Sequence, residues 1–180
     1  TLRKSEIDWV YQAGASFLFA DVWEEYLEPI PENERGDLVA AYHRRLFDAD
    51  PAVHVPAGVA WTVWENSTIR LVPDAAGIAE ARTDVDSAVA FARIENHYFT
   101  NAGWMEDGQL IREAREKLAG IPGVIVQGRY DVCTPAVTAW DLHRAWPEAE
   151  FEMISDAGHA SSEPGIVDAL VRATERFAAH

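Results

Sequence analysis

The first part of the chain shows apolar residues at the spacing of amphipathic helices. Between residues 51 and 71, apolar and small side chains recur at intervals of three and four, so they share one helix face. Residues 85–99 repeat the pattern behind Asp84, a residue type that caps helix N-termini. Residues 31–46 predict a helix that begins with a proline and an acidic first turn. Residues 73–82, rich in alanine, glycine and proline, predict a loose loop within what we expect to be a helical lobe.

The pattern changes in the last third of the chain. It predicts a buried strand, a helix, a second strand and a closing helix at residues 124–126, 136–146, 151–154 and 166–177. A strand, a helix and a strand at this spacing indicate a right-handed parallel crossover. Because two parallel strands cannot alone form a stable sheet covered on both faces, the segment resembles the last part of a larger sheet. We expect an α/β fold with a helical domain over residues 1–118 and a strand-containing domain over residues 119–180.

The composition of the chain argues against several classes of binding partner. The chain has 180 residues, of which 48% are hydrophobic, and a net charge of −15, which repels nucleic-acid phosphates and anionic lipid. We expect neither a nucleic-acid nor a membrane partner, since no apolar run is long enough to span a bilayer. Cys133 is the single cysteine, which excludes an internal disulfide framework and a multi-thiolate zinc site and fits a cytoplasmic location. No metal or other cofactor is expected, and the start at Thr1 rather than methionine indicates processing, cleavage or truncation.

Asp131 and His159 follow the two predicted strands. The ligand crevice of an open parallel sheet lies outside the carboxyl ends of its strands, so both side chains are expected at that edge. An aspartate that accepts a hydrogen bond from histidine fixes the tautomer of the ring and supports the imidazolium formed when the histidine takes a proton. The residues therefore suit a catalytic pair, while an ordinary turn aspartate and an ordinary loop histidine are the alternative.

A nucleophile for such a pair is not evident in the sequence. A serine hydrolase of the α/β type needs its serine on a G-x-S-x-G elbow between a strand and a helix. The nearest candidate is residues 14–18, where Leu18 stands in place of the second glycine and no buried strand precedes the serine. Ser161 and Ser162 follow the histidine and are expected to cap or solvate the start of the last helix.

Glu65 and Glu95 fall on the apolar faces of their predicted helices. A carboxylate on a partly dry, aromatic face needs a cationic partner, either an arginine of the protein or the ammonium group of a ligand. The pattern leaves the alternatives open, because each glutamate could also reach solvent or pair with Arg70 or Arg93. Two such residues together favour a pocket for a cation.

Several short motifs together resemble the proline iminopeptidases, which are serine exopeptidases of the α/β-hydrolase superfamily. The motifs are W-V-Y-Q-A-G-A-S at 9–16, I-P at 30–31 with Arg35, A-W and W-E within 60–65, A-R-I-E-N-H-Y-F at 92–99, G-R-Y-D at 128–131, A-W-D-L at 139–142 and D-A-G-H at 156–159. The likeness spans nearly the whole chain, and E-N-H-Y-F and G-R-Y-D fall in the family's order and spacing. It implies the C-terminal portion of such an enzyme, with residues 1–118 as the helical cap over the active site and residues 119–180 as the last two parallel strands and helices of the hydrolase sheet.

The same resemblance implies roles for single charged residues. Asp131 and His159 would be the acid and base of a Ser-Asp-His triad, in the chain order of the α/β-hydrolases. Glu65 and Glu95 would bind the charged imino group of an N-terminal proline.

The resemblance also implies an apolar pocket for the proline ring. Trp9 and Phe99 match positions that line this pocket, and Thr134 would lie on the substrate side as well. Two departures bear on the fit of the pocket. Val10 stands where an aromatic residue is often found, and the cysteine that the family commonly has at the position of Thr134 is displaced to Cys133.

The family's early strands, its oxyanion-hole loop and its nucleophile elbow are expected to precede Thr1. The hypothesis is therefore a serine exopeptidase that releases N-terminal proline from peptides, of which this chain is a fragment, inactive without the missing N-terminal half. Two alternatives stand beside it. One is a non-catalytic binding module with a pocket for cationic N-termini, and the other is a capped α/β-hydrolase for esters or epoxides, which has no evident use for an amine-binding pair of glutamates.

Overall fold

The computed structural model describes residues 2–178, which form two compact units. The helical unit comprises Leu2–Thr68 and Val72–Asp107, and the strand unit comprises residues 108–178 together with the short segment Ile69–Leu71. Within the described residues, no helix combines the length and the apolar character needed to cross a bilayer.

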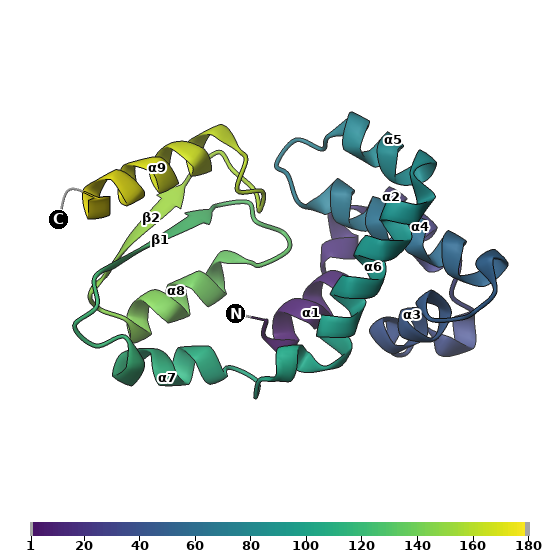
Figure 1. Cartoon of the computed structure of the whole chain (residues 1–180), viewed down its shortest axis with the longest axis horizontal. Coiled ribbons are helices and arrows are strands. Elements are labelled where there is room, and N and C mark those ends of the chain that lie inside the picture. The colour runs from purple at the N-terminus through teal and green to yellow at the C-terminus, as the bar shows by residue number, and fades with distance from the viewer. Residues whose placement is uncertain (1, 179–180) are drawn as a thin grey trace. The chain divides into compact units, whose positions relative to one another are not determined.

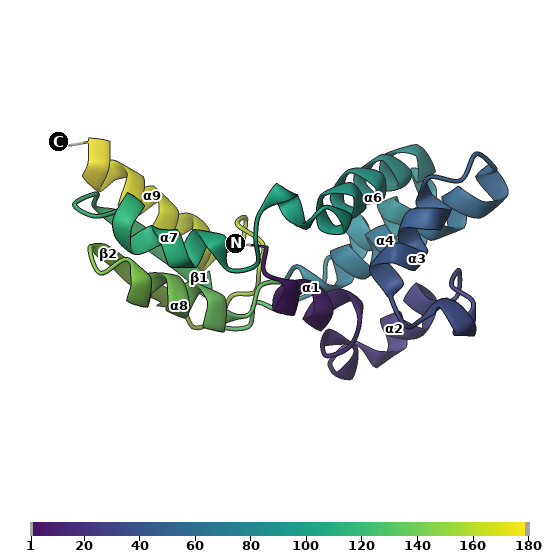
Figure 2. The same ribbon diagram turned by 90° about the horizontal axis from the view of Figure 1, so that it is seen from below.

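The helical unit consists of α-helices and three short 3₁₀ turns. The helices are α1 (Lys4–Tyr11), α2 (Ala20–Leu27), α3 (Leu38–Leu46), α4 (Pro51–Thr68), α5 (Ala75–Thr83) and α6 (Val85–Thr100). The 3₁₀ turns are η1 (Ala15–Phe17), η2 (Glu32–Glu34) and η3 (Ala102–Trp104). Helices α4 and α6 lie side by side, as Figure 2 shows, and form the centre of the unit.

An aromatic core stabilises the helical unit. Trp61, Trp64, Tyr26 and Tyr42 are fully buried, and the rings of the two tyrosines stack with their centroids 4.6 Å apart. The Tyr42 hydroxyl donates a hydrogen bond to the carbonyl of Tyr26. Large rings bury much apolar area, and stacked pairs add about 0.5–1.5 kcal/mol beyond that burial. The aromatic side chains therefore fix α2, α3 and α4 against one another.

The faces predicted for α4 and α6 are confirmed along most of their length. The expected stripes are buried at Ala57, Ala60, Trp61, Trp64 and Thr68 of α4 and at Ala88, Val89 and Ala92 of α6. The outlying positions of the two stripes, Val53, Val85 and Phe99, are only half-buried. The cap predicted at Asp84 is present as well, because its carboxylate accepts a hydrogen bond from the backbone N–H of Ser87 at 3.1 Å.

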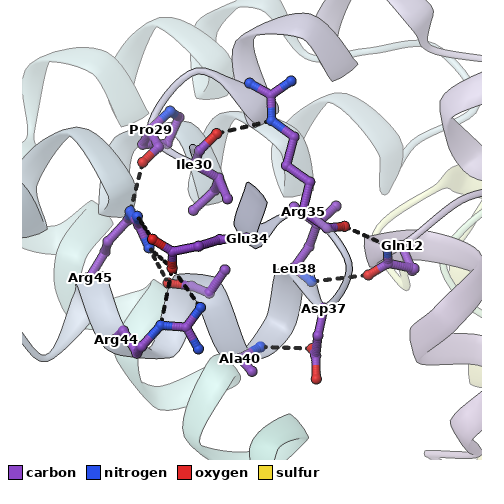
Figure 3. Close-up of polar contacts among 11 residues, drawn as sticks. Gln12, Pro29, Ile30, Glu34, Arg35, Asp37, Leu38, Ala40, Arg44 and Arg45 are labelled. Carbon is purple, nitrogen blue, oxygen red and sulfur yellow. Dashed lines mark hydrogen bonds and ion pairs between the residues drawn. The ribbon is translucent and has the colours of Figure 1, made fainter. Parts of the chain in front are cut away.

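The predicted start of α3 at Pro31 is wrong. Glu32–Glu34 form the separate turn η2, and the helix begins at Leu38. The cap explains the difference: the carboxylate of Asp37 accepts a hydrogen bond from the backbone N–H of Ala40 at 3.0 Å, which Figure 3 shows. The helix therefore begins behind the aspartate, since its side chain satisfies one of the N–H groups that a helix start leaves open.

Glu34 connects the turn before α3 to the last turn of that helix (Figure 3). Its carboxylate accepts hydrogen bonds from the guanidinium groups of Arg45 and Arg44, at 2.9 Å and 2.6 Å. The bonds from Arg45 and then Arg44 lower the pKa of Glu34 to about 2. Arg45 also donates to the carbonyl of Pro29 at 2.7 Å, so the segment ahead of α3 is held against the helix.

The predicted loop at residues 73–82 is also wrong. Most of this segment is α5, which begins at Ala75 behind a cap from Asp74, whose carboxylate accepts from the N–H of Ala76 at 3.0 Å. The proline that suggested a loop, Pro73, precedes the cap and removes no helical hydrogen bond there. Alanine is the best helix former, so the alanine-rich segment continues as a helix.

The strand unit contains a parallel β-α-β segment. Its elements are α7 (Gln109–Lys117), β1 (Gly123–Gly128), α8 (Ala136–Ala145), β2 (Ala149–Ile154) and α9 (Pro164–Ala178). The two strands pair in parallel, with Gly128 opposite Ile154, so the predicted order and pairing are confirmed. Figure 1 shows the strands between α8 and α9, and both helices contact them.

The division into units falls earlier than the domain boundary expected at residue 118. The chain divides between Asp107 and Gly108, because α7 packs against α8 of the strand unit. Periodicity identifies α7 as a helix, but the spacing of apolar residues does not say which neighbouring element a helix packs against.

The crossing of α4 and α6 generates a test of the fold. A Cβ atom added to Gly58 of α4 would lie 2.6 Å from Val89 Cγ2 and 2.9 Å from Val89 Cα of α6. We expect Gly58→Ala to push the helices apart and to lower the free energy of unfolding by about 1–3 kcal/mol. Urea denaturation measures this effect. Gly36→Ala is the matched control, because nothing lies within 4 Å of its added Cβ, and equal stabilities of the two variants would contradict the close crossing.

Candidate active site

The structure brings Asp131 and His159 together. Asp131 lies three residues beyond the end of β1 at Gly128, and His159 lies in the loop that follows β2. Since the strands are parallel, both loops leave the sheet at the same edge. The Nδ1 atom of His159 lies 3.1 Å from Asp131 Oδ2, which is hydrogen-bond distance. The expected pairing geometry is therefore present.

Asp131 is a turn residue as well as a partner of histidine. Its Oδ1 accepts the backbone N–H of Thr134 at 2.7 Å, and its Oδ2 accepts the Thr134 hydroxyl at 2.8 Å and the Gln127 side-chain amide at 3.1 Å. The Asp131 side chain is only 6% exposed. Burial by itself raises the pKa of Asp131, but the hydrogen bond and charge of His159, together with the bonds from Thr134, hold that pKa below its ordinary value. The carboxylate thus stays ionised beside the imidazole ring.

Thr134 contacts the acid–base pair directly. Besides its bonds to Asp131, its hydroxyl oxygen lies 3.2 Å from His159 Nδ1. It therefore orients the carboxylate, while the role in substrate binding that the sequence suggested stays a prediction. Cys133, one residue earlier in the same turn, brings its sulfur within 4.8 Å of ligand atoms of Asp131 and His159, so the turn and the loop after β2 together hold three metal-ligating side chains.

Gly128 allows the two loops to approach. A Cβ atom at this position would lie 1.9 Å from the carbonyl oxygen of Gly158 and 2.7 Å from that of Ala157. The backbone N–H of Tyr130 donates to the same Ala157 carbonyl at 2.9 Å. Any side chain at residue 128 would separate the loops that carry the aspartate and the histidine. The resemblance included this glycine, but its role emerges only from the packing.

Glu163 holds the loop of His159 from the other side. It is buried, and its Oε1 accepts the backbone N–H groups of Gly158 at 3.0 Å and Leu71 at 3.1 Å. The carbonyl of Ile69 accepts the N–H of His159 at 3.1 Å. The histidine loop is thereby fixed between the start of α9 and the short segment Ile69–Leu71. Sequence reasoning missed Glu163, although an acidic residue immediately before the proline that begins a helix was a usable signal.

Glu163 generates a second test. Glu163→Ala leaves the buried N–H of Gly158 and the part-buried N–H of Leu71 without their acceptor. We expect it to lower the free energy of unfolding by about 1–3 kcal/mol and to speed hydrogen exchange at the Gly158 amide. Glu163→Gln keeps an acceptor oxygen and should lose less. Glu175→Ala, at an exposed position of α9, is the control. The same protection of the Gly158 amide in Glu163→Ala as in the unsubstituted chain would show that Glu163 does not hold this loop.

Glu65 and Glu95 lie close together in the helical unit. Glu65 is buried, and its Oε1 accepts the hydroxyl of Tyr11. Glu95 Oε2 accepts the indole N–H of Trp61 at 2.8 Å. Burial raises the pKa of Glu65 well above its ordinary value, the negative charge of Glu95 raises it further, and the bond from Tyr11 opposes both effects. The carboxyl groups are therefore near enough to repel each other when both are ionised.

Three aromatic rings, those of Tyr11, Trp61 and Phe99, pack together beside these two glutamates. Tyr11 stacks on Trp61 with centroids 4.7 Å apart, and Phe99 lies 5.0 Å from Tyr11 and 6.2 Å from Trp61. The ring of Trp9 packs against the backbone of Gly14, which has the left-handed φ of 133°. Phe99 thus lies beside the hydrogen-bond partners of both glutamates.

One arginine that the sequence offered as a partner has a different role. Arg93 Nε donates to the carbonyl of Leu46 at 2.6 Å, and the guanidinium lies over the ring of Phe47. This arginine therefore links α6 to the end of α3.

A cavity of about 340 Å³ opens elsewhere in the helical unit. Its lining includes Phe99, Ile7, Val39 and three aspartates, but neither Glu65 nor Glu95. The cavity therefore does not coincide with the glutamate pair.

Glu65 generates a test of pH dependence. Because the folded protein raises the pKa of Glu65, its contribution to stability is largest below the unfolded value of 4.5 and is lost as the pH rises toward the folded value. Glu65→Gln removes the charge and keeps an acceptor for Tyr11. We expect this variant to gain stability relative to the unsubstituted chain as the pH rises above 4.5, and urea denaturation at pH 5 and pH 8 measures the difference. A difference that stays constant with pH would contradict a buried, shifted Glu65.

Comparison with known proteins identifies the class to which this fold and site belong. Residues 6–165 match the alpha/beta hydrolase fold, so the chain belongs to the α/β-hydrolase family. Among curated proteins it is similar to proline iminopeptidases: it is 52% identical over 178 residues to that of Xanthomonas citri, covering 98% of this chain and 56% of that protein. It is 50% identical over 179 residues to the proline iminopeptidase of Arabidopsis thaliana, covering 99% and 47% of the two chains. The resemblance drawn from the motifs is confirmed, and the chain spans about half the length of the curated relatives it matches.

Proposed function

We propose that this chain is the C-terminal portion of a serine exopeptidase that releases N-terminal proline from peptides. One observation carries the proposal: a buried aspartate is hydrogen-bonded to a histidine at the carboxyl ends of two parallel strands, in a member of the α/β-hydrolase family. Asp131 and His159 would be the acid and base of the triad. The relatives named proline iminopeptidase support the choice of substrate.

The geometry suits proton transfer by His159. With Nδ1–H donated to Asp131, Nε2 would be the ring atom that takes the proton of a serine hydroxyl as the serine oxygen attacks the carbonyl carbon. The ionised Asp131 stabilises the imidazolium that forms. His159 then gives the proton to the leaving amine, and water hydrolyses the acyl-enzyme by the same exchange in reverse. Thr134 keeps the carboxylate oriented throughout.

In this proposal, the serine nucleophile lies outside these 180 residues. None of them fits a G-x-S-x-G elbow. The partner of this chain in the proposal is therefore the N-terminal half of the hydrolase, which supplies the nucleophile and the oxyanion hole. Residues 1–180 alone would not turn over substrate.

The pair formed by Glu65 and Glu95 indicates that the substrate carries a charged amine. The ring nitrogen of a protonated N-terminal proline carries two N–H groups and a positive charge, so Glu65 and Glu95 can each accept one hydrogen bond. A cation between them removes their repulsion and offsets the cost of burying Glu65. The apolar ring of the proline would contact Phe99 and Trp9.

The same pair separates the alternatives. An ester or epoxide brings no charge to compensate two close carboxylates, so the pair favours an amine over a neutral substrate. A binding module for cationic N-termini would use the glutamates but would need neither the bond between Asp131 and His159 nor its support by Glu163.

Glu95 tests the proposed selectivity. In the complete hydrolase, Glu95→Gln keeps the shape of the side chain and removes its charge. A hydrogen bond to a charged group contributes about 1.5–3 kcal/mol, so kcat/KM for a proline arylamide should fall by roughly tenfold to a hundredfold, while hydrolysis of a neutral acetyl ester is spared. Glu24→Gln, an exposed glutamate of α2, controls for the change in net charge. Equal losses on the amide and the ester would mean that Glu95 supports the fold rather than substrate recognition.

A further inference from the structure

Three different metal-ligating side chains meet at the carboxyl edge of the strand unit. The ligand atoms of Asp131, Cys133 and His159 all lie within 4.8 Å of one another. Two of these residues belong to one short turn, and the third comes from the loop after β2. The cluster contains one oxygen, one sulfur and one nitrogen ligand.

The separation of the oxygen and nitrogen ligands is close to that in a tetrahedral site. Zinc bonds of about 2.0–2.3 Å to nitrogen, oxygen and sulfur put neighbouring ligand atoms roughly 3.3–3.6 Å apart. The distance between Asp131 Oδ2 and His159 Nδ1 is 3.1 Å, which differs from this by a few tenths of an ångström. The sulfur of Cys133 lies within 4.8 Å of the other two ligand atoms, and a change of its side-chain rotamer would bring it to bonding distance.

The surroundings of the cluster also suit a cation. The N–H of Thr134 binds Oδ1 of Asp131 at 2.7 Å, as an outer-shell partner of a metal ligand does. Oδ2 faces the histidine and also accepts the Thr134 hydroxyl at 2.8 Å and the Gln127 amide at 3.1 Å, so an ion would share this oxygen with those two donors. The His159 side chain is 41% exposed, which gives an ion access from solvent. The net charge of −15 attracts cations to the protein.

We infer that Asp131, Cys133 and His159 form a binding site for one zinc ion or a similar thiophilic divalent cation. The thiol of Cys133 loses its proton to solvent on binding, and the resulting thiolate and the carboxylate balance the two charges of the ion. The neutral imidazole keeps its hydrogen on the nitrogen that does not bind, and water fills the fourth position, as in zinc sites with three protein ligands. This site differs from the expectation of no metal that the sequence suggested; the single cysteine rules out only sites with several thiolates, and this site needs one.

Zinc at this site would inhibit the proposed hydrolase. An ion bound to Asp131 and His159 replaces the hydrogen bond between them and occupies the ring that has to accept a proton. This consequence rests on the proposed function, whereas the binding of the ion does not.

Cobalt and zinc binding to the isolated chain test the site itself. We expect chelator-treated residues 1–180 to bind one Co²⁺ with a sulfur-to-cobalt charge-transfer absorption, and Zn²⁺ to displace it. Calorimetry in millimolar Mg²⁺ should still detect Zn²⁺, because Mg²⁺ competes for carboxylates but not for a thiolate. Cys133→Ser should abolish the absorption, and Cys133→Ser and His159→Gln should each weaken zinc affinity at least about tenfold.

The controls make each outcome decisive. His54→Gln removes a histidine of the helical unit and should bind zinc like the unsubstituted chain, and circular dichroism of every variant checks that it folds. Absence of saturable zinc binding in Mg²⁺ would overturn the site. Unchanged affinity in His159→Gln would overturn it too, because the thiol would then bind the ion without the histidine.

Inhibition is measured separately in the complete hydrolase. The zinc concentration that halves the rate on a proline arylamide should rise at least about tenfold in Cys133→Ser. A hydrolase that binds zinc at this site but never cleaves proline arylamides would contradict the proposed function and leave the zinc site standing. An active hydrolase whose inhibition by zinc is the same in Cys133→Ser would contradict the inhibitory role.

Discussion

The hydrogen bond between Asp131 and His159 depends on how closely two loops can approach at the end of a parallel strand pair. Three features serve that approach. Gly128 has no side chain to separate the loops, Thr134 fixes the carboxylate within its own turn, and Glu163 holds the backbone of the histidine loop. These contacts hold the pair in place before any substrate binds. The Asp131 carboxylate remains ionised because the histidine and the threonine favour its charged form and so lower its pKa.

The hydrogen bonds described above for the two glutamates of the helical unit come from uncharged donors. Glu65 is buried near a second carboxyl group, that of Glu95, and the hydroxyl of Tyr11 and the indole of Trp61 donate hydrogen bonds to the two glutamates without supplying a positive charge. Such an arrangement costs stability in the absence of a cation and favours the binding of one. The proposed recognition of an amine would account for two acidic side chains in an apolar, aromatic environment.

Much of the architecture was predictable because it follows from periodicity. The buried stripes of α4 and α6 and the parallel strand pair could be inferred from spacing alone. The start of α3 and the helix α5 could not, because caps from Asp37 and Asp74 decided them against the suggestion of nearby prolines. Strand-end geometry predicted that Asp131 and His159 would meet, whereas the contact of Glu163 with residues 69–71 joins segments far apart in the chain and leaves no periodic signal.

The central claim is that Asp131 and His159 act as one catalytic pair. The most direct test measures the turnover of a proline arylamide by the complete hydrolase carrying Asp131→Asn. The substitution keeps the shape of the side chain and an acceptor for Thr134, but removes the charge that orients and stabilises the imidazolium. Our account predicts a fall in kcat on the order of 10³–10⁴-fold with the fold intact. A folded variant that turns over at nearly the rate of the unsubstituted hydrolase would contradict it.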